Sequence, residues 1–137
     1  MRLRFDQLAA HLRGRLAPVY LFCGEEPWQL GEAVRMVRAH ALAQGFEREV
    51  LDQEANFDWS ALAAAADALS LFASRRLIEL RLGAAALGQE GGAAVRRYCE
   101  RATPDTMLLM VAPQLDRKDL KTKWAQLEAV VGAEKRL

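Results

Sequence analysis

Residues 19–27, Val-Tyr-Leu-Phe-Cys-Gly-Glu-Glu-Pro, decide the fold of this chain. Five apolar, β-prone residues without alternation predict a strand that is buried on both faces, as in a parallel sheet. Gly24 closes this strand, and Pro27 suits the first turn of a helix, where its missing N–H is no loss. A strand, a glycine and a helix in this order indicate the first unit of an α/β domain.

Helical and β-prone segments alternate along the rest of the chain. Apolar periodicity predicts helices near residues 5–15, 27–44, 59–69, 94–102 and 119–126, the third of them capped by Asp58. Apolar runs predict strands over residues 46–52, 77–82 and 106–112, and a last strand from residue 129. The glycine-rich stretch 83–92 is expected to be a loop with a frayed helix start. This alternation predicts one doubly wound, P-loop-like domain, residues 1–137, with a parallel sheet covered on both faces.

The loop after the first strand lacks the residues that bind phosphate. Counted from Gly24, a P-loop needs a glycine, a lysine and a hydroxyl residue where this chain has Gln29, Leu30 and Gly31. Neither of the two later apolar strands ends in the acidic residue that would hold magnesium. We therefore expect no ATP hydrolysis. The alternative hypothesis is a nucleotide-binding or ATPase domain with an atypical phosphate loop.

The same loop carries two carboxylates. Glu25 and Glu26 come immediately before Pro27, at the N-terminus of the expected helix. Carboxylates at this position interact favourably with the positive end of the helix dipole and repel a polyphosphate. Adjacent acids can also serve acid–base chemistry, but helix capping explains them more simply. No metal or cofactor is expected, because His11 and His40 have no cysteine or carboxylate at ligand spacing.

Composition is that of an ordinary globular protein. The 137 residues carry a formal net charge of +1, so no overall basic field indicates nucleic acid. Two cysteines and the lack of a long apolar segment predict a cytoplasmic protein in a reducing compartment, without membrane contact. DNA binding stays an alternative hypothesis that rests on local basic residues: Arg75, Arg76, Arg96, Arg97, Lys118, Lys121 and Lys123.

Two large apolar residues, Leu71 and Phe72, lie side by side where the third expected helix meets the next strand. The run around them, residues 69–76, is Leu-Ser-Leu-Phe-Ala-Ser-Arg-Arg. Neighbours on a helix point about 100° apart, so both residues cannot easily follow one buried stripe. Two interpretations stay open: the pair fills the core at this junction, or it is an exposed apolar anchor for a partner.

These motifs together resemble the delta subunit of the bacterial DNA polymerase III clamp loader. The likeness rests on residues 19–27, on Asp58-Trp59 and on residues 69–76, and Gln-Gly-Phe at 44–46 and Trp124 also fit. It extends over nearly the whole chain. The run Ser-Leu-Phe-Ala-Ser-Arg is its specific part.

The resemblance implies an AAA+-type domain without catalytic activity of its own, within the DNA-directed DNA polymerase (nucleotidyltransferase) holoenzyme. It implies that Leu71 and Phe72, with Leu69 and Ser70 beside them, insert into an apolar pocket of the beta sliding clamp. The family member then holds the ring open so that DNA can enter. The gamma or tau and delta prime subunits are further implied partners, and DNA is contacted indirectly or weakly.

The chain departs from the family's pattern in two ways. Clamp-binding segments of this kind often carry a glutamine a few residues before the apolar pair, where this chain has Asp67 and Ala68. A polar contact with the clamp is therefore expected to be lost. Family members also continue into further domains, so we expect this chain to be an N-terminal fragment.

Overall fold

The computed structural model describes residues 2–14, 16–24, 26–53, 58–67, 75–82, 88–101, 103–113 and 129–133. In these residues, six strands form one sheet in the order β1-β6-β2-β5-β4-β3, and all neighbouring pairs are parallel. The strands are β1 (Arg2–Arg4), β2 (Val19–Gly24), β3 (Phe46–Asp52), β4 (Arg75–Arg81), β5 (Thr106–Ala112) and β6 (Ala129–Ala133). The helices are α1 (Phe5–Leu12), α2 (Pro27–Ala43), α3 (Ser60–Asp67) and α4 (Gly88–Glu100).

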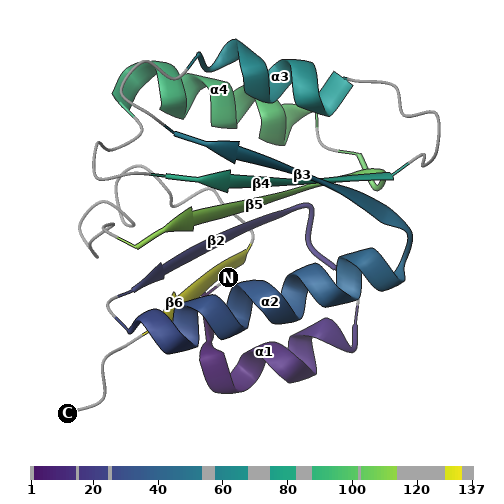
Figure 1. Cartoon of the computed structure of the whole chain (residues 1–137), viewed down its shortest axis with the longest axis vertical. Helices are drawn as coiled ribbons and strands as arrows, with labels where there is room; N and C mark the ends of the chain where they lie inside the picture. Colours follow the sequence, from purple (N-terminus) through teal and green to yellow (C-terminus); the bar gives the residue numbers. More distant parts are fainter. Residues whose placement is uncertain are drawn as a thin grey trace.

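Helices cover both faces of the sheet, with α1 and α2 on one face and α3 and α4 on the other (Figure 1). β2 contributes to both cores. Tyr20 and Phe22 belong to the core under α1 and α2, whereas Val19, Leu21 and Cys23 belong to the core under α3 and α4. All five side chains are buried, as the continuous apolar run of a central parallel strand requires. The predicted α/β class with a parallel sheet is confirmed.

Several predicted elements occur at the predicted residues. β3 and β5 cover 46–52 and 106–112, and α2 begins at Pro27. The apolar stripe predicted for α2 is buried, at Leu30, Val34, Val37 and Ala41. The Asp58 cap is also confirmed, because its Oδ1 accepts the backbone N–H of Ser60 at 3.0 Å. The helix expected over residues 119–126 lies outside the described residues.

Two elements differ from the sequence prediction. The prediction of a loop over 83–92 is wrong for the second half of this stretch, because α4 already begins at Gly88 and not near residue 94. Glycine is a poor helix former, but Val95 and Tyr98 of the same helix are buried against the sheet, and this packing outweighs local propensity. The sequence also gives no signal for β1, a three-residue strand that pairs with β6.

Gly45 makes the turn between α2 and β3. Its φ of +91° lies in a region that residues with a Cβ rarely adopt. The turn allows β3 to begin at once, at Phe46, beside the end of the helix. Gly31 differs from Gly45, because it lies inside α2 and a Cβ placed there would meet no atom within 4 Å.

We predict opposite effects for alanine at these two glycines. Gly45→Ala should lower the free energy of unfolding by about 1 kcal/mol, since alanine is strained at positive φ. Gly31→Ala should raise it by up to about 1 kcal/mol through its better helix propensity. Urea denaturation of the two variants and the wild type measures both changes. Equal effects of the two substitutions would contradict this assignment of the turn.

Candidate functional site

The junction of β2 and α2 is the degenerate phosphate loop, at the carboxyl edge of the sheet. Glu26 is the N-cap of α2, and Pro27 is its first residue. The Glu26 carboxylate accepts the backbone N–H of Trp28 at 3.2 Å and that of Gln29 at 2.7 Å. Phosphate would bind to such N–H groups at a helix N-terminus. The capping predicted for Glu26 is confirmed, and Glu25 lies outside the described residues.

A cavity of about 450 Å³ lies beside this loop, between α2 and the ends of β4 and β5. Ligands of open parallel α/β sheets bind at this edge. Most of the wall is apolar, and its charged part consists of Arg38, Glu79 and Arg81. No lysine is among the described residues that line the cavity, and two N–H groups at the adjoining helix N-terminus are already bonded to Glu26. The described part of the lining therefore contains none of the groups that hold a triphosphate.

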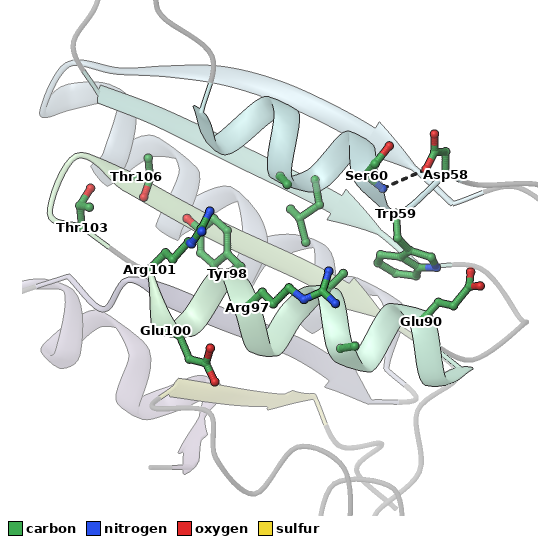
Figure 2. A pocket seen from close by; sticks show the side chains of 14 residues that line it. Asp58, Trp59, Ser60, Glu90, Arg97, Tyr98, Glu100, Arg101, Thr103 and Thr106 are labelled. Atoms are coloured by element: carbon green, nitrogen blue, oxygen red, sulfur yellow. Dashed lines mark hydrogen bonds between the residues drawn. The ribbon is translucent and has the colours of Figure 1, made fainter.

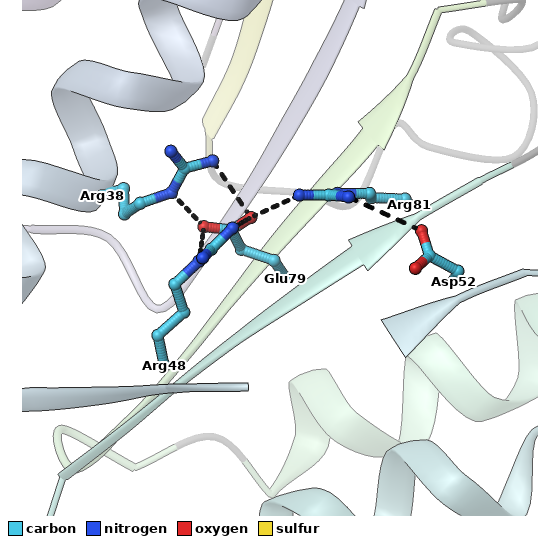
Figure 3. Close-up of polar contacts among 5 residues, drawn as sticks. All are labelled: Arg38, Arg48, Asp52, Glu79 and Arg81. Carbon is cyan, nitrogen blue, oxygen red and sulfur yellow. Dashed lines mark hydrogen bonds and ion pairs between the residues drawn. The ribbon is translucent and has the colours of Figure 1, made fainter. Parts of the chain in front are cut away.

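The charged wall is built around one buried carboxylate, that of Glu79 in the middle of β4 (Figure 3). Arg48 on β3 donates to Glu79 through Nε at 2.8 Å and Nη2 at 3.1 Å. Arg38 on α2 donates through the same two nitrogens. Arg81 comes within 3.9 Å of Glu79 and of Asp52. The Glu79 carboxylate therefore joins α2, β3 and β4.

The electrostatics of Glu79 exclude the role of a general acid at neutral pH. Burial raises the pKa of this carboxyl, because a buried charge loses its hydration. Hydrogen bonds from Arg48 and Arg38 and their positive charges lower the pKa by more, so it lies below its ordinary value of 4.5. Glu79 is therefore ionised at neutral pH. Its oxygens face guanidinium groups, so it is not placed to hold magnesium.

The sequence analysis missed Glu79, although a signal was present. Glu79 lies two residues after Leu77, which belongs to the core under α1 and α2, so both side chains face α2. A charge on a buried face needs partners. These partners, Arg38 and Arg48, are 41 and 31 residues away in the sequence, so no local pattern identifies them.

The predicted clamp-binding residues, Leu69, Ser70, Leu71 and Phe72, lie outside the described residues, as does Ala68. The described chain ends α3 at Asp67 and resumes at Arg75, the first residue of β4. Because α3 returns from the carboxyl edge and β4 starts at the amino edge, the segment over 68–74 connects two ends at the amino edge. Asp67 and Arg75, the described residues on either side of this segment, therefore lie at the edge opposite to Glu26.

Arg75 is held in place at the end of this segment. Its guanidinium lies over the Phe46 ring, 5.6 Å from the centroid, and its Nη1 donates to the Gln44 carbonyl at 3.1 Å. Arg75 is also the register partner of Phe46 in the sheet. These contacts hold the start of β4 against β3 and the turn after α2.

The described basic residues of the DNA-binding hypothesis lie on two elements, β4 and α4. Arg76 is largely buried and donates to Glu49 at 2.7 Å, and Arg75 has the contacts given above. Arg96 and Arg97 are exposed on α4. The remaining members lie outside the described residues: Lys118, Lys121 and Lys123.

Both histidines form hydrogen bonds within the described part of the chain. His11 Nε2 shares a hydrogen bond of 2.7 Å with the Tyr20 hydroxyl, and His40 Nδ1 lies 3.1 Å from the Met36 carbonyl. The described ranges contain no group of three or more His, Cys, Asp or Glu side chains that could hold a metal ion. In the same ranges, no helix has the length and apolar character needed to span a membrane.

Comparison with known proteins gives consistent matches. A family model described as DNA polymerase III, delta subunit, matches residues 20–135. The chain is 41% identical over 83 residues to DNA polymerase III subunit delta of Escherichia coli K12, which covers 60% of this chain and 24% of that protein. It is 33% identical over 78 residues to the Haemophilus influenzae protein of the same name, covering 56% and 23%. The matched region is about a quarter of these relatives' length.

A solved structure, the Bacillus subtilis DNA clamp loader delta protein, has a similar fold. The TM-score is 0.72, and the match covers 96% of this chain and 43% of that one. At 23% sequence identity, this similarity shows that the two chains share a fold and nothing about function.

We predict that Glu79→Gln lowers the free energy of unfolding by about 2 kcal/mol at pH 7, because the partly exposed guanidiniums of Arg38 and Arg48 lose their charged hydrogen-bond acceptor. The folded pKa of Glu79 is lowered, so its contribution is complete above about pH 4.5 and is lost as the pH falls through the folded pKa. Urea denaturation from pH 7 to pH 3 should show that the free energy of unfolding falls less on acidification in the variant than in the wild type. Glu32→Gln, at an exposed pair with Arg35, is the control and should change little. Equal stabilities for Glu79→Gln and the wild type at pH 7 would contradict the proposed role.

We also predict that millimolar ATP with magnesium leaves the melting temperature unchanged, because Glu26 occupies the phosphate position. A ligand at a hundred times its Kd would add about 2.7 kcal/mol, a shift of several degrees. Differential scanning calorimetry measures this, with magnesium and inorganic phosphate at equal ionic strength as the control. A rise that is specific to the nucleotide would favour the alternative hypothesis of an atypical phosphate loop.

Proposed function

Because the chain belongs to the DNA polymerase III delta subunit family, we propose that it binds the beta sliding clamp and helps to open the ring during DNA replication. We assign the contact to Leu71 and Phe72, with Leu69 and Ser70 beside them. Contacts with the gamma or tau and delta prime subunits are proposed for a protein with the length of the curated relatives.

The arrangement of the two sheet edges supports this proposal. Asp67 and Arg75, the described residues that precede and follow the segment with Leu71 and Phe72, lie at the amino edge. The phosphate-loop remnant lies at the carboxyl edge, where Glu26 bonds to the N–H groups of the helix. A clamp contact at the amino edge therefore needs no nucleotide at this loop. In such a loader, ATP would act on other subunits, which expose or cover the clamp-binding segment.

The size of the two side chains fits an anchor. Burial of a leucine or a phenylalanine contributes roughly 1.5–3 kcal/mol each. Interfaces concentrate their energy in a few such residues. Within the described residues, the exposed large apolar side chains are Trp28 and Leu42, both on α2. Trp28 packs edge-on against Phe5 at a centroid distance of 5.9 Å.

Ring opening follows from differential affinity. A protein that binds the open ring more tightly than the closed ring shifts the population toward the open form. The shift equals the difference between the two binding free energies, so the binder itself consumes no ATP. A rigid support helps to turn binding into ring opening, and the contacts of Arg75 with Phe46 and Gln44 provide such support at one end of the segment.

We predict that Leu71→Ala combined with Phe72→Ala lowers affinity for the sliding clamp by at least about a hundredfold. The reason is the loss of both apolar side chains from the clamp pocket. Isothermal titration calorimetry of the 137-residue chain with purified clamp measures this. Circular dichroism should show an unchanged fold.

Leu42→Ala is the matched control for this experiment. Leu42 is 45% exposed, on α2, and its replacement removes a comparable apolar surface elsewhere. We expect wild-type clamp affinity for this variant. A double variant that binds as tightly as Leu42→Ala would refute the anchor and return Leu71 and Phe72 to the core interpretation.

A further inference from the structure

A second cavity, the α3–α4 cavity, lies between these two helices and has a volume of about 840 Å³. This size is within the range of ligand sites. Its apolar lining comes from Trp59, Leu62 and Ala63 at α3, and from alanines of α4. The start of β5 and the turn before it close one end.

One buried polar group in the lining has no partner. Tyr98 on α4 is only 7% exposed, and its hydroxyl has no hydrogen-bond partner. Thr106 lies close enough to affect the pKa of Tyr98, without the geometry of a hydrogen bond. Burial raises the pKa of Tyr98 to about 12, so the hydroxyl keeps its proton and can donate it. An unpartnered buried hydroxyl is unfavourable, which indicates a group that is satisfied when a ligand is bound.

Two exposed arginines belong to the same lining. Arg97 and Arg101 are four residues apart on α4 and its end, so they share one side. Within the described part of the chain neither forms an ion pair. Figure 2 shows Arg101, Thr103 and Thr106 at one end of the cavity, and Trp59, Asp58 and Glu90 at the other.

We propose that the α3–α4 cavity binds an acidic segment of a partner polypeptide, whose carboxylate pairs with Arg101 and Arg97 and accepts the Tyr98 hydroxyl. An apolar side chain next to that carboxylate packs against Trp59 and Leu62. The Tyr98 oxygen is covered in the free chain. The side chains around this oxygen move when the carboxylate enters. Arginine suits this role because its fork of N–H groups matches a carboxylate.

The lining favours this partner over nucleic acid or a small anion. Asp58, Glu90 and Glu100 also line the cavity, and they repel the repeated charges of a DNA backbone. A single carboxylate needs only the end where Arg101 lies, which is opposite to Asp58 and Glu90 (Figure 2). Inorganic phosphate would leave the apolar lining without contact. A polypeptide provides both the charge and the apolar side chain.

A titration with two isosteric peptides tests the proposal. The probe is acetyl-Phe-Asp-amide, and acetyl-Phe-Asn-amide is its neutral control. Both are added to the ¹⁵N-labelled 137-residue chain, and the amide shifts of α3 and α4 are followed by NMR. We expect saturable shifts with the aspartate peptide and binding at least about tenfold weaker with the asparagine peptide. Equal binding of the two peptides would overturn the proposal.

Substitutions on α4 locate the contact. Arg101→Gln and Arg97→Gln should each lower the affinity for the aspartate peptide by about tenfold. Arg96→Gln, an exposed neighbour that does not line the cavity, should leave its affinity unchanged. Equal affinities for the Arg101 and Arg96 variants would overturn the site. The proposal would also be overturned if inorganic phosphate or a DNA oligonucleotide shifted the amide resonances of α3 and α4 as strongly as the aspartate peptide does.

Tyr98→Phe separates a binding role from a packing defect. Removing a hydroxyl that lacks a partner should leave the melting temperature unchanged or raise it. Affinity for the aspartate peptide should fall severalfold, because the carboxylate loses one donor. Unchanged affinity in this variant would show that the hydroxyl does not take part in binding and would refute the assignment of Tyr98.

Discussion

A buried charge on the central part of the sheet determines how one side of this domain is assembled. Glu79 faces α2 from β4, at a place where an apolar side chain would be stable alone and an isolated carboxylate would not. Arg38 and Arg48 neutralise it from a helix and from an edge strand. β3 is an edge strand and pairs only with β4 in the described sheet. The ion pair between Arg48 and Glu79 therefore attaches β3 to β4 a second time, whereas a central strand is already held by two neighbouring strands.

The two edges of the sheet differ in chemistry. At the carboxyl edge, Glu26 bonds to the first N–H groups of α2, and the nearby strand end carries Arg81 instead of an acidic residue. The element order of a nucleotide-binding domain is thus retained without its phosphate contacts. At the amino edge, Arg75 holds the start of β4 against Phe46, next to the segment proposed to bind the clamp. The proposed clamp contact would use the amino edge, so it would not depend on the phosphate contacts that the carboxyl edge lacks.

Prediction from sequence succeeded where a local pattern carries enough energy to decide the structure. β2 and β5 are continuous apolar runs, and the proline at the start of α2 specifies a helix boundary. It failed at Gly88, where glycine's low helix propensity is outweighed by the burial of Val95 and Tyr98 further along the same helix. The Leu71–Phe72 anchor is a prediction from the family resemblance, and it is tested by clamp binding.

The sequence by itself determined the order of the described strands and helices apart from β1, and the loss of the phosphate loop, because both depend on residues that are neighbours along the chain. Glu26 caps the helix that begins one residue later, so its role follows from position alone. Only the tertiary structure decided the partners of Glu79 and the cavity between α3 and α4. Arg38, Arg48 and Glu79 meet because the sheet places α2, β3 and β4 side by side, and such contacts between distant residues leave no periodic signal in the sequence.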